Sequence, residues 1–135
     1  FQESRYIRKK DSLKINKKIK ILIAEDNSFN QDVLVNMLQT LDYHEVKVVN
    51  DGVDAIKSLQ DNKYDLLLLD LKMPRMDGYQ VMEFLKRNKQ NLKIIPLTAS
   101  VLEEDQARCQ AYGVYSFLRK PIDLKDLQNA LIMWK

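Results

Sequence analysis

The chain has 135 residues, of which 45% are hydrophobic and 30% are charged, and these proportions are typical of a globular domain with a single core. No apolar run approaches the roughly 20 residues that a membrane helix needs, so we expect no membrane contact by this domain, and no signal peptide is visible. The net charge is +3, but residues 1–19 hold seven basic and two acidic residues, which leaves 15 basic and 17 acidic residues elsewhere and argues against direct nucleic-acid binding.

Residues 1–18 show no sustained hydrophobic period and are predicted to be a basic linker or leader, followed by one domain over residues 19–135. The first residue is Phe1 and not methionine, which suggests a piece of a longer chain or a processed one. The single Cys109 cannot form an internal disulfide. One cysteine fits a reducing compartment, and we expect a cytoplasmic location.

From residue 19 onward, short β-branched or leucine-rich runs alternate with segments of helical spacing. Strands are predicted at residues 19–24, 46–49, 65–69, 93–97 and 115–118. A helix is predicted after each strand, beginning at Ser28, after residues 50–52, near Tyr79, at Ser100 and at Asp123. Strict alternation predicts a parallel sheet with helices on both faces. Two of these helices are predicted to open with a capping box, Ser28 with Gln31 and Ser100 with Glu103.

The third predicted strand contains four consecutive leucines, which indicates a strand that is buried on both faces. The strand leads directly to Asp70. Regular structure is then interrupted by Pro74 and by the Asp77–Gly78 pair, so we expect Asp70 to stand at the start of a loop. Open α/β sheets place their chemistry at the carboxyl ends of their strands. An aspartate at a strand end is also common in proteins without such a role.

Polar or charged residues also end three of the other predicted strands. Glu25 and Asp26 follow the first strand, Thr98 follows the fourth, and Lys120 follows the fifth. In a parallel sheet these ends share one edge, so three carboxylates, one hydroxyl and one ammonium should converge there. Crowded acids need a raised pKa or a bound cation, and oxygen ligands without histidine or cysteine favour Mg²⁺ first, with Mn²⁺ possible. Asp70 could then act as a nucleophile on phosphorus and form an aspartyl phosphate.

Residues 19–134 resemble the receiver domain of two-component response regulators. Four motifs carry the resemblance: Ile-Ala-Glu-Asp-Asn at 23–27, Asp-Leu-Lys-Met-Pro-Arg-Met-Asp-Gly at 70–78, Leu-Thr-Ala at 97–99 and Phe-Leu-Arg-Lys-Pro at 117–121. The resemblance implies a flavodoxin-like (βα)5 fold, a three-layer α/β sandwich with strand order 2-1-3-4-5. It also implies that Asp70 accepts a phosphoryl group from phosphohistidine.

The resemblance further implies a metal site. Asp26 and Asp70 would ligate Mg²⁺ by their side chains and Lys72 by its backbone carbonyl, and Glu25 would act on the metal through water.

The remaining site residues are implied in the same way. Lys120 would pair with the phosphoryl oxygens, Thr98 would donate a hydrogen bond to them, and Phe117 would be the aromatic switch. The family often has tyrosine at the position of Phe117, so a switch here would work by packing alone. The Lys120–Pro121 bond is a candidate cis peptide on the family pattern.

The Glu-Asp-Asn run and the Met-Pro-Arg-Met-Asp-Gly loop resemble receivers attached to hybrid histidine kinases, although a free-standing regulator would have much the same sequence. The implied partners are a histidine kinase or a histidine phosphotransfer protein. Whether the chain is an enzyme stays open: it would phosphorylate and dephosphorylate itself with Mg²⁺, and a hybrid parent would be a protein histidine kinase.

Two other classes of protein share part of this pattern. A phosphatase of the haloacid dehalogenase type also uses a strand-end aspartate, but it carries a second aspartate two residues later, where this chain has Lys72. A phosphorylation-independent, receiver-like interaction module is the stronger alternative. Such modules usually lack one of the acids, the threonine or the lysine, and this chain has all of them.

Overall fold

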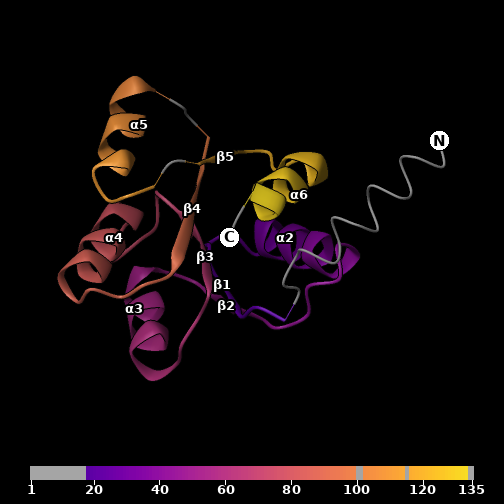
Figure 1. The fold of residues 1–135 in the computed structure, drawn as a ribbon, viewed down its shortest axis with the longest axis horizontal. Helices are drawn as coiled ribbons and strands as arrows, with labels where there is room; N and C mark the ends of the chain where they lie inside the picture. The colour runs from indigo at the N-terminus through magenta and orange to yellow at the C-terminus, as the bar shows by residue number, and fades with distance from the viewer. Residues whose placement is uncertain (1–17, 100–101, 115, 134–135) are drawn as a thin grey trace.

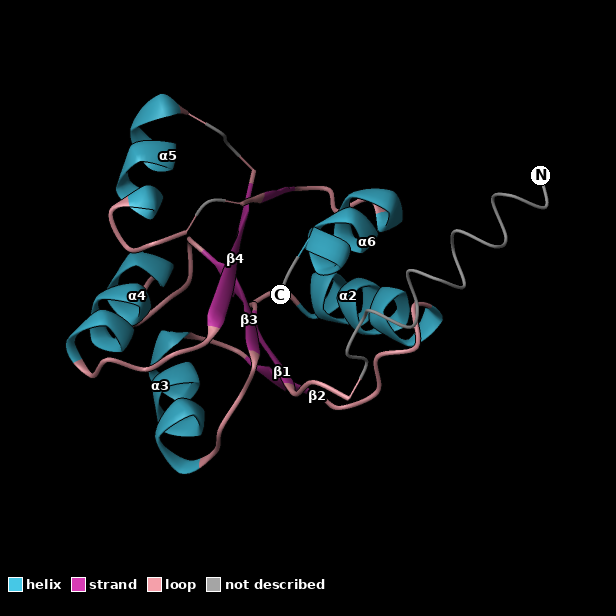
Figure 2. Cartoon of the chain, in the orientation of Figure 1, coloured by secondary structure: helices cyan, strands magenta, loops and turns pink. Residues whose placement is uncertain are grey.

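The computed structural model describes residues 18–99, 102–114 and 116–133. Five parallel strands form one sheet in the order β2-β1-β3-β4-β5, with a helix after each strand (Figures 1 and 2). The elements in chain order are β1 Ile21–Ala24, α2 Ser28–Thr40, β2 Val46–Val49, α3 Gly52–Asp61, β3 Leu66–Asp70, α4 Gly78–Arg87, β4 Lys93–Thr98, α5 Glu103–Gln110, β5 Leu118–Arg119 and α6 Leu124–Met133. The predicted alternation and strand order are confirmed.

The helices cover the two faces of the sheet, so the molecule has three layers. Helices α3, α4 and α5 lie on one face, and α2 and α6 lie on the other (Figure 1). Successive side chains of a strand point to opposite faces. Leu67 and Leu69 of β3 accordingly pack into the core under α3 and α4, while Leu66 and Leu68 pack into the core under α2 and α6. All four leucines are fully buried, which explains the uninterrupted apolar run.

A capping box forms at α4, where none was predicted, and not at α2, where one was. The residue before α4, Asp77, accepts a hydrogen bond from the Gln80 backbone N–H through its side chain, and the Gln80 side-chain oxygen accepts one from the Asp77 backbone N–H. At α2, however, Asn27 is the N-cap and accepts from the Asn30 N–H, so the predicted capping box of Ser28 and Gln31 is wrong. Asparagine and serine cap equally well, and the cap falls on the residue nearer the end of β1.

Helix α5 begins later than predicted, at Glu103, with Leu102 as its N-cap. The predicted capping box depends on Ser100, which lies outside the described residues. The helix ends near Gly113, as predicted, and this residue has a φ of +85° that favours glycine.

The fifth strand is shorter than predicted. Strand β5 holds only Leu118 and Arg119, which pair with Leu97 and Thr98 of β4, and Tyr115 lies outside the described residues. The predicted leader also falls largely on undescribed residues, 1–17. Among the described helices, none has the length and apolar character needed to cross a membrane.

Candidate phosphoacceptor and metal site

The acidic residues predicted from the strand ends lie together at the carboxyl edge of the sheet. Ala24 of β1 pairs with Leu69 of β3, so Glu25 and Asp70 follow at the same level on neighbouring strands. Glu25 is fully buried and Asp70 is 4% exposed, whereas Asp26 is exposed. One carboxylate oxygen from each of the three lies within 4.8 Å of the others.

Lys120 lies between the two buried acids. Its Nζ is 2.9 Å from Glu25 Oε1 and 3.0 Å from Asp70 Oδ2, to which it donates a hydrogen bond. The Lys72 backbone N–H donates to the other oxygen of Asp70, Oδ1, at 3.0 Å. Both oxygens of Asp70 therefore have donors, which fixes the orientation of its carboxylate.

The electrostatics of the two buried acids differ. Burial raises the pKa of Asp70 to about 6, and the charge of Glu25 adds to this shift against the hydrogen bonds from Lys72 and Lys120. Burial also acts to raise the pKa of Glu25, but the Lys120 ammonium and the Asn27 N–H outweigh it and lower that pKa. Burial acts to lower the pKa of Lys120, and its two acidic partners raise it, so this side chain is a cation.

The arrangement fits a divalent cation. Glu25 Oε1 is buried and, although close to Lys120, accepts no well-aligned hydrogen bond, so it retains acceptor capacity. It lies beside two further carboxylates, and the three offer only oxygen ligands, which suit a hard cation. A cavity of about 240 Å³ adjoins them and could hold the ion together with a phosphoryl group.

The structure also locates the other predicted residues. Thr98 ends β4 and is 6% exposed, and with Lys72 and Lys120 it lines the same cavity. Phe117 precedes β5 and is half-buried against the core under α3 and α4. The Lys120–Pro121 peptide bond is cis.

The chain matches a family model along most of its length. The model is that of the response regulator receiver domain, and it covers residues 21–132. The chain belongs to this family.

Curated relatives of this receiver domain include much longer histidine kinases. The sensor histidine kinase RcsC of Escherichia coli (strain K12) is 35% identical over 88% of the chain, and the hybrid signal transduction histidine kinase K of Dictyostelium discoideum is 33% identical over 85%. The chain spans only 12% and 10% of these two proteins. The predicted similarity to hybrid-kinase receivers is confirmed.

Solved receiver structures agree with the fold. The receiver domain of sensor histidine kinase PA1611 from Pseudomonas aeruginosa PAO1 is 36% identical, with a TM-score of 0.77, and covers 87% of this chain and 97% of its own. That crystal structure has a magnesium ion coordinated in its active site cleft. The chemotaxis protein CheY4 of Vibrio cholerae is 26% identical, with a TM-score of 0.78, and covers 87% of this chain and 99% of its own.

Sequence reasoning missed one residue that supports the receiver site. The Gln31 side chain donates to the Glu25 backbone carbonyl at 2.6 Å and to Asn50 Oδ1 at 2.8 Å, and so links the ends of β1 and β2. The pattern Ser-x-x-Gln suggested a local cap instead. The better signal is that Gln31 lies one helical turn after the start of α2, the helix that follows β1.

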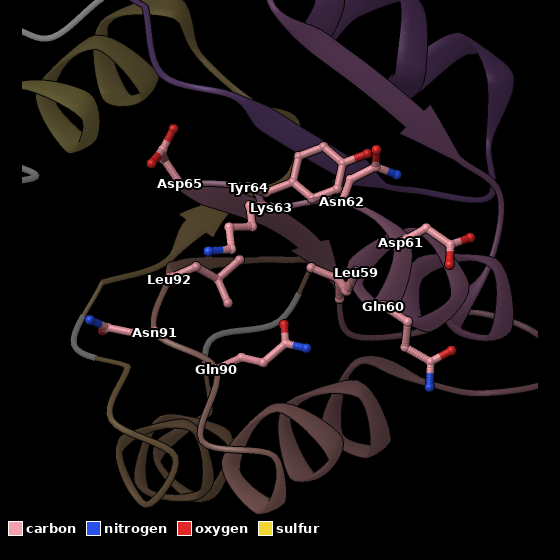
Figure 3. A pocket seen from close by; sticks show the side chains of 10 residues that line it. All are labelled: Leu59, Gln60, Asp61, Asn62, Lys63, Tyr64, Asp65, Gln90, Asn91 and Leu92. Carbon is pink, nitrogen blue, oxygen red and sulfur yellow. The ribbon is translucent and has the colours of Figure 1, made fainter.

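A second cavity lies at the opposite edge of the sheet. It has a volume of about 610 Å³, and Figure 3 shows its lining side chains, which come from the segments that lead into β3 and β4. These residues are Leu59, Gln60, Asp61, Asn62, Lys63, Tyr64, Asp65, Gln90, Asn91 and Leu92. Since β3 separates it from Asp70, this cavity takes no part in the site at the carboxyl edge.

Proposed function

We propose that this receiver domain accepts a phosphoryl group on Asp70 from a phosphohistidine, in two-component or phosphorelay signalling. The observation that carries the proposal is the orientation of the buried Asp70 carboxylate by Lys120 and the Lys72 N–H, beside the carboxylates of Glu25 and Asp26. Phosphoryl transfer depends mainly on such positioning and on charge neutralisation.

In the proposed reaction an oxygen of Asp70 bonds to phosphorus as the bond from phosphorus to the histidine nitrogen breaks. The electron pair of the broken bond stays on the imidazole nitrogen. Asp70 must be ionised to attack, and its pKa of about 6 leaves it so near neutral pH. Lys120, now 3.0 Å from Asp70, would pair with the incoming phosphoryl oxygens.

The same residues would hold a divalent cation, Mg²⁺ first and Mn²⁺ as an alternative. Asp26 and Asp70 would ligate it by their side chains, Lys72 by its backbone carbonyl, and Glu25 through water. When bound, the ion supplies positive charge that offsets the acids and the phosphoryl oxygens. Glu25 supports this assignment because it is fully buried and lies beside two further carboxylates.

Phosphorylation would then act as a switch. Thr98 lies at the edge of the cavity, and the phosphoryl oxygens would draw its hydroxyl inward. Phe117 is half-buried beside the core, and it would turn further inward by packing alone. The phosphoryl group would then pass on to another histidine or be hydrolysed.

The partners proposed for this domain are a histidine kinase or a histidine phosphotransfer protein, and a hybrid histidine kinase is the proposed parent. Support comes from the similarity to segments of RcsC and of the Dictyostelium hybrid kinase.

The experiment is incubation with acetyl phosphate and Mg²⁺, read by intact mass. A phosphoryl-sized mass gain is expected for the natural chain and not for Asp70→Asn, and chelation of the metal should prevent it. An equal gain in Asp70→Asn would refute the assignment to Asp70. No gain with either acetyl phosphate or a phosphorylated histidine kinase would favour a phosphorylation-independent interaction module.

A further inference from the structure

The loop from Leu71 to Asp77 connects the phosphoacceptor strand to α4, and Arg75 lies at its tip. The φ of Arg75 is +63°, in the left-handed region, which costs a non-glycine residue about 1 kcal/mol or more. A conformation of this kind persists only where its surroundings hold it.

The guanidinium of Arg75 reaches across to the start of α3. Its Nε donates to Asp51 Oδ2 at 2.7 Å, and its Nη2 donates to Asp54 Oδ1 at 3.3 Å. Asp51 is itself fixed, because its other oxygen caps α3 by accepting from the Asp54 N–H at 2.8 Å. The loop tip is thus bound to the N-terminus of α3, a helix that precedes the loop in the sequence.

Backbone packing brings the same two segments together. A Cβ on Gly52 would overlap the carbonyl oxygen of Met76, so the loop backbone lies directly against the first turn of α3. Glycine permits this close approach. Arg75 therefore adds a side-chain anchor next to a backbone contact, and the two together define where the loop lies.

The other side of the loop faces the phosphoacceptor. Three residues before Arg75, the Lys72 N–H donates to Asp70 Oδ1 at 3.0 Å, and the Lys72 backbone carbonyl is the proposed metal ligand. We propose that Arg75 is a positioning residue. By tying the loop tip to Asp51, the N-cap of α3, and to Asp54 in its first turn, it holds the Lys72 backbone beside Asp70 in the geometry that binds the cation. This inference rests on the proposed function and extends it to a residue outside the cavity.

The competing explanation is a surface ion pair with no effect on the site. The Arg75 side chain is 56% exposed, and exposed pairs contribute only about 0–1 kcal/mol to stability. The chain offers a matched control in Arg87, whose Nε lies 3.1 Å from Glu83 Oε2 and whose side chain is 78% exposed. Arg87 is in α4, away from the loop tip.

The test compares Arg75→Asn, Arg75→Lys and Arg87→Asn with the natural chain. Asparagine tolerates positive φ, so Arg75→Asn removes the guanidinium with little backbone penalty. Mg²⁺ affinity is measured by calorimetry, and amide exchange at Lys72 is measured in metal-free protein. We expect Arg75→Asn to weaken Mg²⁺ binding about threefold or more and to speed exchange at Lys72. Arg75→Lys should fall between it and the natural chain, and Arg87→Asn should change neither.

The sign of the effect separates positioning from simple electrostatics. Removing a cation near an acidic site should by itself strengthen Mg²⁺ binding, whereas loss of positioning weakens it. Stronger or unchanged binding in Arg75→Asn with unchanged Lys72 exchange would overturn the inference, as would an equal loss in Arg87→Asn. If the natural chain bound no Mg²⁺, the proposed function would fail. Exchange at Lys72 would then decide the inference alone, with faster exchange supporting it and unchanged exchange overturning it.

Discussion

Replacing Asp70 by asparagine should make the metal-free protein more stable near neutral pH. The substitution keeps the shape of the side chain and removes a buried negative charge next to Glu25. Lys120 loses one partner but keeps its contact with Glu25 at 2.9 Å. The ionised Asp70 carboxylate therefore lowers the stability of the folded protein relative to a neutral side chain at this position. Residues that lower stability in this way are common at functional sites.

The size of the effect follows from the pKa of Asp70, which burial raises from 3.8 to about 6. One pKa unit corresponds to about 1.4 kcal/mol, so the full cost of ionised Asp70 in the folded state is about 3 kcal/mol. Above pH 6 this cost is complete. Between pH 3.8 and about pH 6, Asp70 keeps its proton in the folded protein but has released it in the unfolded chain. The free energy of unfolding therefore falls as the pH rises through this range. Below 3.8 both states are protonated and the cost disappears.

The assay is urea unfolding of the natural chain and of Asp70→Asn, with chelator present, at pH values on both sides of this window. We expect Asp70→Asn to be more stable by about 1–3 kcal/mol above the window and to match the natural chain below it. Mg²⁺ should stabilise the natural chain and have a smaller effect on the variant. A variant that is equally or less stable above the window would show that Asp70 is not held at an electrostatic cost.

Three further predictions concern the surrounding residues. Lys120→Ala leaves two buried carboxylates without their shared cation and should lower the free energy of unfolding by about 3 kcal/mol near neutral pH, whereas a loss below about 1 kcal/mol in urea unfolding would contradict the central role of this ion pair. Lys72 lines the cavity, and its cation could cover the phosphoryl oxygens and slow their hydrolysis, so Lys72→Ala and Lys72→Asn should shorten the half-life of the phosphoprotein. Half-lives that agree within about twofold, a barrier difference under roughly 0.4 kcal/mol, would remove this role. Phosphorylation should shift an existing equilibrium in which Thr98 and Phe117 move inward, with a coupling of about 1–3 kcal/mol, so NMR spectra of the free and beryllofluoride-bound forms should differ in α5 and β5, and identical spectra would count against it.

Much of the fold could be predicted because the buried strands have distinctive sequences. The leucine run of β3 supplies both cores, since alternate side chains point to opposite faces. Once the sheet is parallel, the residues that follow each strand must meet at one edge. Glu25, Asp70 and Lys120 could therefore be grouped although they lie far apart in the sequence.

Other features depend on tertiary contacts that local patterns do not encode. The choice of Asn27 over Ser28 as a cap was open because both residue types cap helices. Strand β5 contains only Leu118 and Arg119, the two residues that pair with Leu97 and Thr98 of β4, and the apolar run alone does not show where that pairing begins. The pairing of Arg75 with Asp51 joins residues 24 positions apart and requires the exact course of a loop.

The most direct test of the account is to locate the phosphoryl group itself. The natural chain would be phosphorylated with acetyl phosphate and Mg²⁺, reduced with borohydride to label the acyl phosphate, digested and mapped by mass spectrometry. The account predicts a single labelled peptide with the label at Asp70. A label at Asp26 or at any other carboxylate, with Asp70 unmodified, would contradict it.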